Sequence, residues 1–270
     1  MSNFWQRAIT GLFFVAVVVF AIIIGPLALS PLFALFGLVG YNEYAKIASR
    51  SFPSVNKVFG FLTVLFFHAV SFAVATDMTE PQTLWLLLPV IFMLPAVELF
   101  GKAENGIVRV WVALAGVVWV VLPFALLPLI GMVRGSYESE IVLGFFVLLW
   151  VNDTGAYLVG RSMGKHKLMP AVSPGKTIEG FVGGVMLSLA AAWGWYDFSE
   201  VLSLSDWLVM AFIVAVFSNA GDLVESLFKR NCGVKDSGNF LPGHGGVLDR
   251  FDGIMLSIPM ILAYLSFTNH

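Results

Sequence analysis

Charged side chains are scarce in this sequence. They make up 12% of its 270 residues, whereas hydrophobic residues make up 59%. A soluble domain carries about 25% charged residues, so this composition excludes an ordinary soluble protein and predicts a chain that crosses a membrane several times. The net charge is −2. Because there is no basic excess, we expect no nucleic-acid partner, and any anionic substrate must be bound by local groups of cations.

Cysteine is almost absent as well. The single cysteine, Cys232, excludes a disulfide within the chain. Because it lies between Arg230 and Lys235, we expect it on a reducing, cytoplasmic side. The sequence also has no linker, internal repeat or low-complexity segment. We therefore predict one integral membrane domain over residues 1–270.

Long hydrophobic runs are abundant. A spanning helix needs about 20 apolar residues, and nine segments meet or approach this length: 8–24, 27–48, 57–76, 83–100, 108–130, 141–163, 179–198, 207–228 and 253–267. The predicted fold is all-α, a polytopic integral membrane protein of about nine transmembrane helices. The first segment is expected to be retained rather than cleaved as a signal peptide, because Pro31 would follow the only suitable cleavage site.

The distribution of Lys and Arg predicts the orientation. Thirteen of the 15 cations fall in the second, fourth, sixth and eighth connections between the predicted spans. The positive-inside rule makes these connections cytoplasmic and places both termini outside. The opposite connections are acidic and hold Asp77, Glu80, Glu138, Glu140, Asp197, Glu200 and Asp206.

The longest polar stretch covers residues 226–252. It combines cations that neutralise phosphate oxygens, carboxylates that hold Mg²⁺, and glycines that let backbone N–H groups approach an anion. Its charged and imidazole side chains are Lys229, Arg230, Lys235, Asp236, His244, Asp249, Arg250 and Asp252. A solvated charged loop is the alternative, although such loops seldom place Gly-His-Gly-Gly directly before Asp-Arg-x-Asp.

A second polar connection lies between residues 160 and 180. Its Gly175-Lys176-Thr177 sequence resembles the end of a P-loop, but Pro170 stands where that motif needs glycine, and we expect no strand before it. We predict instead a Gly-Lys-Thr turn at a helix N-terminus, where free N–H groups and the helix dipole favour phosphate. His166 is interpreted as part of a solvated basic loop.

Several polar side chains lie in or at the ends of the predicted spans, where charge costs several kcal/mol unless it faces a cavity or a partner. They are Glu43, Asn152, Asp153, Asn219, Asp222 and Glu225. Helical spacing places four side chains on one face of the eighth segment: Asn219, Asp222, Ser226 and Lys229. Glu225 can pair with Lys229 at i+4. A structural polar seam is the alternative. Gly180 and Gly184 are interpreted as points of close helix packing.

Three carboxylates suggest a metal site. Asp222 lies near the end of the eighth segment, and Asp249 and Asp252 share a helical face before the ninth. Oxygen ligands that leave coordination positions open suit Mg²⁺ bridged to substrate phosphates better than zinc, which prefers His and Cys clusters. Phosphoryl-type transfer then depends mostly on positioning and charge neutralisation.

Four motifs follow one another in the polar stretch: Ser226-x-x-Lys229-Arg230, Lys235-Asp236-Ser237-Gly238, Pro242-Gly243-His244-Gly245-Gly246 and Asp249-Arg250-x-Asp252. Together they resemble the signature of the CDP-diacylglycerol synthases, or phosphatidate cytidylyltransferases. Further segments resemble that family at Asn152-Asp153-Thr154-Gly155-Ala156-Tyr157, Gly160-Arg161 and Ser173-Pro174-x-Lys176-Thr177-x-Glu179-Gly180. Gly175 departs from the lysine that the family often has there. The resemblance covers roughly the C-terminal half, residues 141–270, and the first five spans match only in hydrophobic character.

The resemblance implies a nucleotidyltransferase of phospholipid biosynthesis. In this reaction the phosphate of phosphatidic acid attacks the α-phosphorus of CTP, releases pyrophosphate and leaves CDP-diacylglycerol in the membrane. The expected partners are CTP, phosphatidic acid and the lipid bilayer, and a homodimer is left open. The expected cofactor is Mg²⁺, with or without a second cation. The compact chain without a targeting extension is expected in the bacterial inner membrane, with its active site on the cytoplasmic face.

The motifs and the resemblance together assign expected roles to residues. The expected catalytic residues are Lys176, Asp222, Lys229, Arg230 and Asp249. The expected substrate-binding residues are Asn152, Asp153, Arg161, Ser173, Lys176, Thr177, Ser226, Lys235, Asp236, His244, Gly245, Gly246 and Arg250. The expected metal ligands are Asp222, Asp249 and Asp252. If the seventh and eighth spans are antiparallel neighbours, Lys176, Lys229 and Arg230 meet in one cytoplasmic pocket.

Two other functions compete with this interpretation. A CTP-dependent lipid kinase would use similar groups but transfer the γ-phosphate, so it would release CDP instead of pyrophosphate. An ion-coupled transporter would place charged groups through the middle of the bilayer and would show inverted repeats. Here the acidic residues cluster towards one face and no repeat is visible, which disfavours the transporter.

Overall fold

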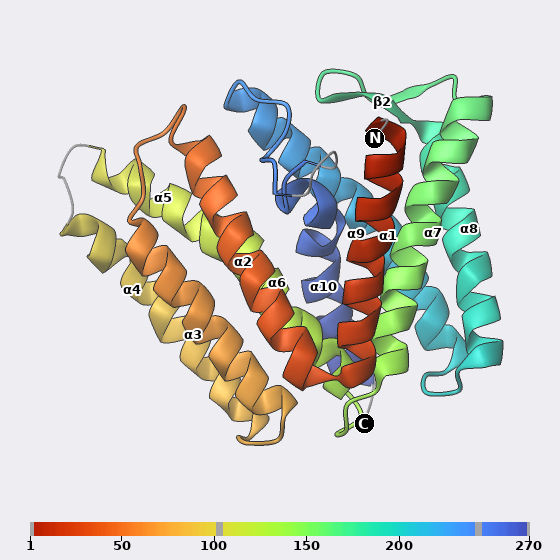
Figure 1. The fold of residues 1–270 in the computed structure, drawn as a ribbon, viewed down its shortest axis with the longest axis horizontal. Coiled ribbons are helices and arrows are strands. Elements are labelled where there is room, and N and C mark those ends of the chain that lie inside the picture. Colours follow the sequence, from red (N-terminus) through yellow and green to blue (C-terminus); the bar gives the residue numbers. More distant parts are fainter. Residues whose placement is uncertain (1–2, 101–104, 241–244, 269–270) are drawn as a thin grey trace. The chain divides into compact units, whose positions relative to one another are not determined.

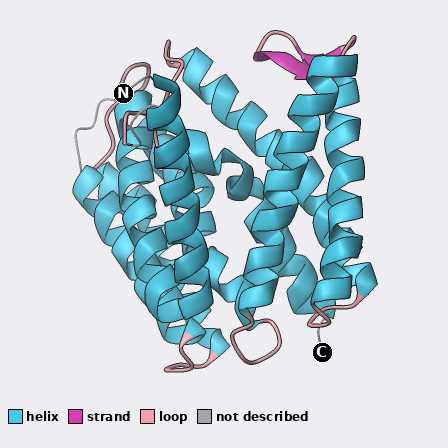
Figure 2. Cartoon of the chain, turned by 45° about the vertical axis from the view of Figure 1, so that its right-hand side comes forward, coloured by secondary structure: helices cyan, strands magenta, loops and turns pink. Residues whose placement is uncertain are grey.

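The computed structural model describes residues 3–100, 105–240 and 245–268. Within these residues the chain is helical apart from its connections and one short hairpin (Figures 1 and 2). Seven helical stretches are long and apolar enough to cross a membrane, and Ala8–Ile24 is a shorter apolar helix. These observations support the predicted all-α membrane protein. Contacts between Cα atoms divide the chain into two compact units, which are described separately.

The first unit consists of Met1–Leu129 and Lys229–Phe251. Its helices are α1 (Asn3–Ile24), α2 (Pro26–Ala48), α3 (Lys57–Ala75), η1 (Pro81–Leu86), α4 (Leu87–Leu99), α5 (Gly106–Gly116), the π-helical η2 (Val117–Val121) and α6 (Leu122–Leu126). The predicted segment 108–130 therefore changes helix type along its length and ends in the 3-10 helix η3 (Leu127–Met132).

Aromatic packing in the first unit positions the start of the last helix, α10 (Leu248–Thr268). The ring of Phe251 lies 5.1 to 5.5 Å from four other phenylalanine rings, those of Phe14, Phe33, Phe36 and Phe124. Leu248 is fully buried, and a Cβ atom at Gly40 of α2 would lie 3.3 Å from its Cδ2. The polar stretch is thus anchored where it enters α10, because displacing Phe251 would expose a large buried ring.

The second unit consists of Ile130–Phe228 and Asp252–His270. It contains α7 (Ser139–Met163), β1 (Lys167–Met169), β2 (Ser173–Thr177), α8 (Ile178–Phe198) and most of α9 (Leu204–Asn231), followed by the rest of α10. Glycines let α7 and α8 approach closely in antiparallel directions. A Cβ atom at Gly183 would lie 2.5 Å from Val159, and one at Gly180 would lie 2.7 Å from the carbonyl oxygen of Ala156. A Cβ atom at Gly184 would lie 2.7 Å from Asn152 Oδ1. The interpretation of Gly180 and Gly184 as packing positions is confirmed.

The hairpin corrects two expectations about the connection between α7 and α8. Residues 175–177, predicted as a Gly-Lys-Thr turn, lie in the extended strand β2 (Ser173–Thr177), which pairs with β1 in antiparallel register (Figure 2). A strand therefore does precede α8, contrary to prediction, but Lys176 and Thr177 lie within that strand and not in a phosphate-binding loop after it. Thr177 then caps α8, because its Oγ1 accepts a hydrogen bond from Gly180 N at 3.1 Å.

The end of α9 follows directly from its sequence. Gly233 has a φ of 70°, a left-handed conformation that glycine adopts without strain. The N–H of Gly233 donates to the carbonyl of Arg230, and that of Val234 donates to the carbonyl of Lys229. This pair of bonds is a Schellman motif, which satisfies the last carbonyl groups of a helix. It stops α9 just after the Lys229-Arg230 pair.

Candidate active site

A cavity of about 480 Å³ lies in the second unit. Its walls come from α7, the hairpin, α8 and α9, and its lining includes Asp153, Tyr157, Arg161, Ser173, Lys176, Thr177, Phe181, Asn219 and Asp222. The lining thus combines cations, carboxylates and apolar groups. This combination suits a ligand that has both an anionic and an apolar part.

Lys176 is the cation most firmly held in this cavity. Its Nζ lies 2.6 Å from Asp222 Oδ2 and 3.2 Å from Asn219 Oδ1. The two charged side chains remain 22% and 33% exposed, respectively. Because this ion pair is open to the cavity, an incoming phosphate can contact Lys176 while Asp222 turns to another cation. The pair therefore fits a binding role better than a purely structural one.

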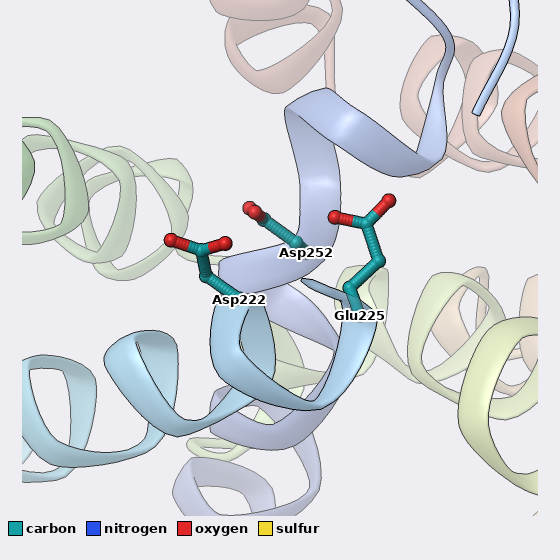
Figure 3. Close-up of side chains that lie close together, drawn as sticks. All are labelled: Asp222, Glu225 and Asp252. Atoms are coloured by element: carbon teal, nitrogen blue, oxygen red, sulfur yellow. The ribbon is translucent and has the colours of Figure 1, made fainter. Parts of the chain in front are cut away.

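Asp222 also belongs to a group of three carboxylates (Figure 3). Asp222 and Glu225 project from α9 and Asp252 projects from α10, and one oxygen of each lies within 4.8 Å of the others. α9 and α10 lie so close together there that a Cβ atom at Gly221 would collide with the carbonyl oxygen of Asp252. Three oxygen donors without His or Cys suit a hard divalent cation such as Mg²⁺, so the residues present fit the expected metal.

Glu225 was not predicted as a metal ligand. The structure places the Glu225 carboxylate beside those of Asp222 and Asp252, and the pair with Lys229 that helical spacing suggests stays a prediction. The spacing of Asp222 and Glu225, three residues apart on one helix, was the available signal, because such residues are neighbours on the helix surface. Asp249, the third predicted ligand, is not in this group among the described residues.

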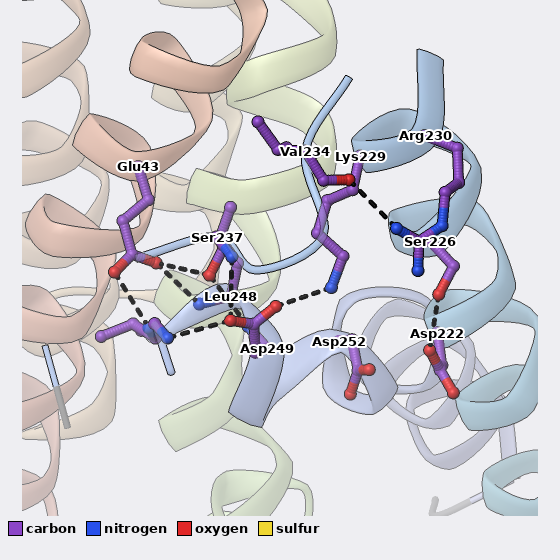
Figure 4. A network of polar contacts seen from close by, with 12 residues as sticks. Glu43, Asp222, Ser226, Lys229, Arg230, Val234, Ser237, Leu248, Asp249 and Asp252 are labelled. Atoms are coloured by element: carbon purple, nitrogen blue, oxygen red, sulfur yellow. Dashed lines mark hydrogen bonds and ion pairs between the residues drawn. The ribbon is translucent and has the colours of Figure 1, made fainter. Parts of the chain in front are cut away.

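Asp249 belongs instead to a network in the first unit (Figure 4). Its Oδ1 lies 2.6 Å from Lys229 Nζ, and its Oδ2 accepts hydrogen bonds from Ser237 N and Gly246 N, both at 2.9 Å. Both members of the ion pair are nearly buried, with Lys229 10% and Asp249 9% exposed. A metal-binding role for Asp249 and a phosphate-binding role for Lys229 stay predictions. So does a shared pocket for Lys176, Lys229 and Arg230, which belong to different units.

The remaining predicted site residues of the second unit have distinct local roles. Asn152 is fully buried, and its Nδ2 donates to Ser218 Oγ at 3.2 Å and to Asp153 Oδ1 at 3.3 Å. Arg161 Nη1 donates to Tyr157 Oη at 2.9 Å at the cavity wall. Ser226 Oγ donates to Asp222 Oδ1 at 3.2 Å and helps to orient that carboxylate (Figure 4).

The remaining predicted residues of the first unit lie mostly on the surface. Arg230, Lys235, Asp236 and Arg250 are exposed, whereas Gly246 is buried. Arg230 Nη1 donates to the carbonyl of Val234 at 3.3 Å. Gly245 has a φ of 86°, a conformation that favours glycine. His244 was predicted to contact phosphate, and it lies outside the described residues.

Glu179 is a further residue near the cavity that received no predicted role. Its carboxylate accepts hydrogen bonds from Lys165 N and His166 N, and it lies 2.6 Å from His166 Nδ1. These contacts close the base of the hairpin that carries Lys176. His166 is exposed, as predicted, with 75% of its side chain accessible.

Comparisons with known proteins agree with this chemistry. The model of the cytidylyltransferase family matches residues 5–268. A phosphatidate cytidylyltransferase of Staphylococcus haemolyticus is 52% identical over 122 residues, which cover 44% of this chain and 46% of the relative. Those of Staphylococcus aureus (strain COL) and Staphylococcus saprophyticus are 50% and 51% identical over the same length. The chain thus spans about half the length of the curated relatives it matches. Since the family model covers nearly the whole sequence, the chain belongs to the cytidylyltransferase family, whose members are nucleotidyltransferases.

Proposed function

We propose that this protein is a phosphatidate cytidylyltransferase, which converts CTP and phosphatidic acid into CDP-diacylglycerol and pyrophosphate with Mg²⁺ as cofactor. The family assignment and the names of the relatives support the choice of nucleotide and lipid. The observation that carries the proposal is that Asp222 belongs to two groups of side chains. It lines the cavity beside Lys176, and it is one of the three clustered carboxylates.

In the proposed reaction an oxygen of the phosphatidic acid phosphate forms a bond to the α-phosphorus of CTP. The bond from that phosphorus to the bridging oxygen of the β-phosphate breaks, and pyrophosphate leaves. No covalent bond to the protein is needed, so the residues contribute by binding, orientation and charge neutralisation. Lys176 and Arg161 are the cations placed to bind phosphate oxygens in the cavity.

Asp222, Glu225 and Asp252 would hold the metal, and Ser226 would orient Asp222. A divalent cation bound there supplies charge neutralisation to phosphate oxygens during transfer. If Asp222 held the metal, its ion pair with Lys176 would weaken, and Lys176 would be available to bind a substrate phosphate.

The lipid substrate accounts for the apolar part of the site. Tyr157 lines the cavity and is 61% exposed, and its neighbour Leu158 and Val182 of α8 are 55% and 51% exposed. In a membrane, exposed apolar side chains on spanning helices contact acyl chains. Phosphatidic acid can then present its phosphate to the cavity while its acyl chains remain in lipid.

We further propose a single integral domain of nine spans in a bacterial inner membrane, with both termini outside and the site facing the cytoplasm. All nine predicted segments coincide with helical stretches, including α1 and α2, which are not among the seven long apolar helices. The bias of cations towards alternate connections supports the orientation. A cytoplasmic site gives access to CTP, which is a soluble nucleotide.

The test uses the purified full chain with CTP, phosphatidic acid and Mg²⁺. We expect pyrophosphate to be released in proportion to CDP-diacylglycerol, and no release when either substrate or the metal is omitted. Release of CDP together with a phosphorylated lipid would establish a lipid kinase instead. Absence of any CTP turnover would contradict both enzymatic functions and would favour the ion-coupled transporter.

A further inference from the structure

Glu43 of α2 is a buried carboxylate far from the polar stretch in sequence. It is 5% exposed. Its Oε2 accepts hydrogen bonds from Ser237 Oγ at 3.1 Å and Leu248 N at 3.0 Å, and its Oε1 accepts one from Val247 N at 3.2 Å (Figure 4). These donors lie 194 to 205 residues further along the chain. A helix of the N-terminal half thus binds the polar stretch at two places, Ser237 and the start of α10.

Two of the three donors lie at the start of α10, which begins at Leu248. The first N–H groups of a helix have no partner within the helix, and they attract negative charge. Glu43 supplies this charge from α2. A carboxylate at this position stabilises the helix start, and it also fixes the direction in which α10 starts.

The third donor connects Glu43 to Asp249. Ser237 donates its hydroxyl to Glu43 and its backbone N–H to Asp249 Oδ2, and its Oγ lies 3.4 Å from Asp249 N. Asp249 in turn forms the ion pair with Lys229. Glu43 therefore binds the serine and the helix start that orient Asp249.

Two glycines of the polar stretch make room for this carboxylate. A Cβ atom at Gly246 would lie 2.5 Å from Glu43 Oε2 and would collide with Ser237 Oγ. A Cβ atom at Gly238 would collide with Glu43 Oε1. Both glycines thus let the backbone enclose the carboxylate, and a side chain at either position would push Glu43 away from its donors.

We propose that Glu43 is a positioning residue for the described part of the motif segment, residues 237–240 and 245–249, and acts through Ser237 and the start of α10 on Asp249. The expected effect on turnover rests on the proposed function. The expected loosening of the motif segment is independent of that function, because it follows from the hydrogen bonds of Glu43 alone. Glu43→Gln removes the negative charge. In addition, the amide nitrogen of the glutamine is a donor and cannot accept the hydrogen bonds that one carboxylate oxygen of Glu43 accepts.

Glu98→Gln is the matched control. Glu98 is also a buried glutamate of the first unit, 1% exposed, and it pairs with Arg109 at 2.7 Å and accepts a hydrogen bond from Asn56 N at 2.9 Å. Its partners lie outside the motif segment. Both variants lose a buried negative charge, so a general loss of stability should affect them alike.

The experiment compares the full-length wild type, Glu43→Gln and Glu98→Gln in detergent. Hydrogen exchange of peptides covering residues 237–240 and 245–249 is measured together with kcat and KM for CTP. We expect Glu43→Gln to speed exchange in this segment at least about tenfold and to lower kcat about tenfold, equivalent to roughly 1.4 kcal/mol. KM should change less than about twofold, because a positioning defect in the transition state lowers kcat. Glu98→Gln should change neither exchange in this segment nor kcat.

Ser237→Ala provides a second variant in case Glu43→Gln does not fold. It removes one hydrogen bond and keeps the carboxylate, and we expect the same local increase in exchange at smaller amplitude. Unchanged exchange in the segment for either folded variant, or an equal loss of kcat in Glu43→Gln and Glu98→Gln, would overturn the inference. If the wild type has no activity but Glu43→Gln loosens the segment selectively, the positioning role stands and the proposed function fails.

Discussion

Asp222 and Asp249 are both paired with a lysine, but their surroundings differ. Asp222 and Lys176 line the cavity and are 33% and 22% exposed, whereas Asp249 and Lys229 are 9% and 10% exposed. Exposed ion pairs contribute about 0 to 1 kcal/mol to stability. Removing one partner of a buried pair typically costs about 3 to 5 kcal/mol. The two aspartates should therefore respond differently to the same substitution.

We expect Asp222→Asn to lower turnover at least about 100-fold, or roughly 2.7 kcal/mol, and to change the free energy of unfolding by less than about 1 kcal/mol. Asp249→Asn should also lose activity, but it should destabilise the fold by several kcal/mol because Lys229 loses its carboxylate. Denaturant unfolding in detergent, combined with the pyrophosphate assay, measures both effects. Equal losses of stability in the two variants would contradict the claim that the difference in burial makes Asp249→Asn the more destabilising substitution.

Cys232 allows a second prediction at this scale. The thiol is 4% exposed, and burial raises its pKa above the ordinary value despite the opposing effects of Ser51 and Arg50. The thiolate is the reactive form, so a raised pKa lowers its fraction at neutral pH. We expect alkylation by N-ethylmaleimide at pH 7 to be at least about tenfold slower than in the chain unfolded by detergent. Equal rates would show that the thiol is accessible.

At the scale of elements, the carboxylate group depends on the contact between α9 and α10. Gly221 of α9 lies against the backbone of Asp252, where a Cβ atom would collide with the carbonyl oxygen. Backbone cannot move aside as a flexible side chain can, so an added methyl group must push the helices apart. The separation of Asp222 and Asp252 would then increase.

Gly221→Ala is therefore expected to weaken Mg²⁺ activation, seen as a rise of at least about threefold in the Mg²⁺ concentration for half-maximal rate, which is roughly 0.7 kcal/mol. Gly194→Ala on α8 is the control, because its Cβ atom would meet nothing within 4 Å. That control should stabilise slightly, since alanine favours a helix by about 1 kcal/mol over glycine. An unchanged Mg²⁺ dependence in Gly221→Ala would remove the α9–α10 contact from the account.

The predictability of the elements follows from the range of the forces that form them. All nine apolar segments coincide with helical stretches, because hydrophobicity over 20 residues is a local property of the sequence. The hairpin at Lys167–Met169 and Ser173–Thr177 was missed, since short polar strands carry no strong pattern. The bond between Glu43 and Ser237 joins residues 194 positions apart, and no local pattern indicates such a contact.

For the candidate site, motifs and helical spacing predicted some of the residues that the structure brings together, but not those contacts that depend on a neighbouring helix. Lys176 and Asp222 were both proposed from motif and spacing, and the structure brings them within 2.6 Å. Helical spacing favours two neighbours for Glu225, Lys229 at i+4 and Asp222 at i−3. The pair with Lys229 stays a prediction, whereas the group with Asp222 could not be predicted in full, because Asp252 comes from the neighbouring helix α10.

At the scale of the whole molecule, the proposed orientation has a direct chemical test. Lys167 lies on the hairpin, and Glu200 follows the opposite end of α8, and both are exposed. Because Cys232 is buried, a cysteine introduced at either position can be labelled selectively in intact cells. We expect Lys167→Cys to react only with membrane-permeant reagents in intact cells and Glu200→Cys to react with impermeant ones. The reverse pattern would place the cavity outside and deny it CTP.

The proposed activity is tested most directly by following the α-phosphorus of CTP. The purified chain is incubated with phosphatidic acid, Mg²⁺ and CTP labelled at either the α- or the γ-phosphate, and the lipid is then extracted. The account predicts that α-label enters the lipid fraction in a one-to-one ratio with released pyrophosphate, that γ-label stays in water, and that Asp222→Asn abolishes the transfer. Entry of γ-label into the lipid, or α-label transfer by Asp222→Asn at the wild-type rate, would contradict it.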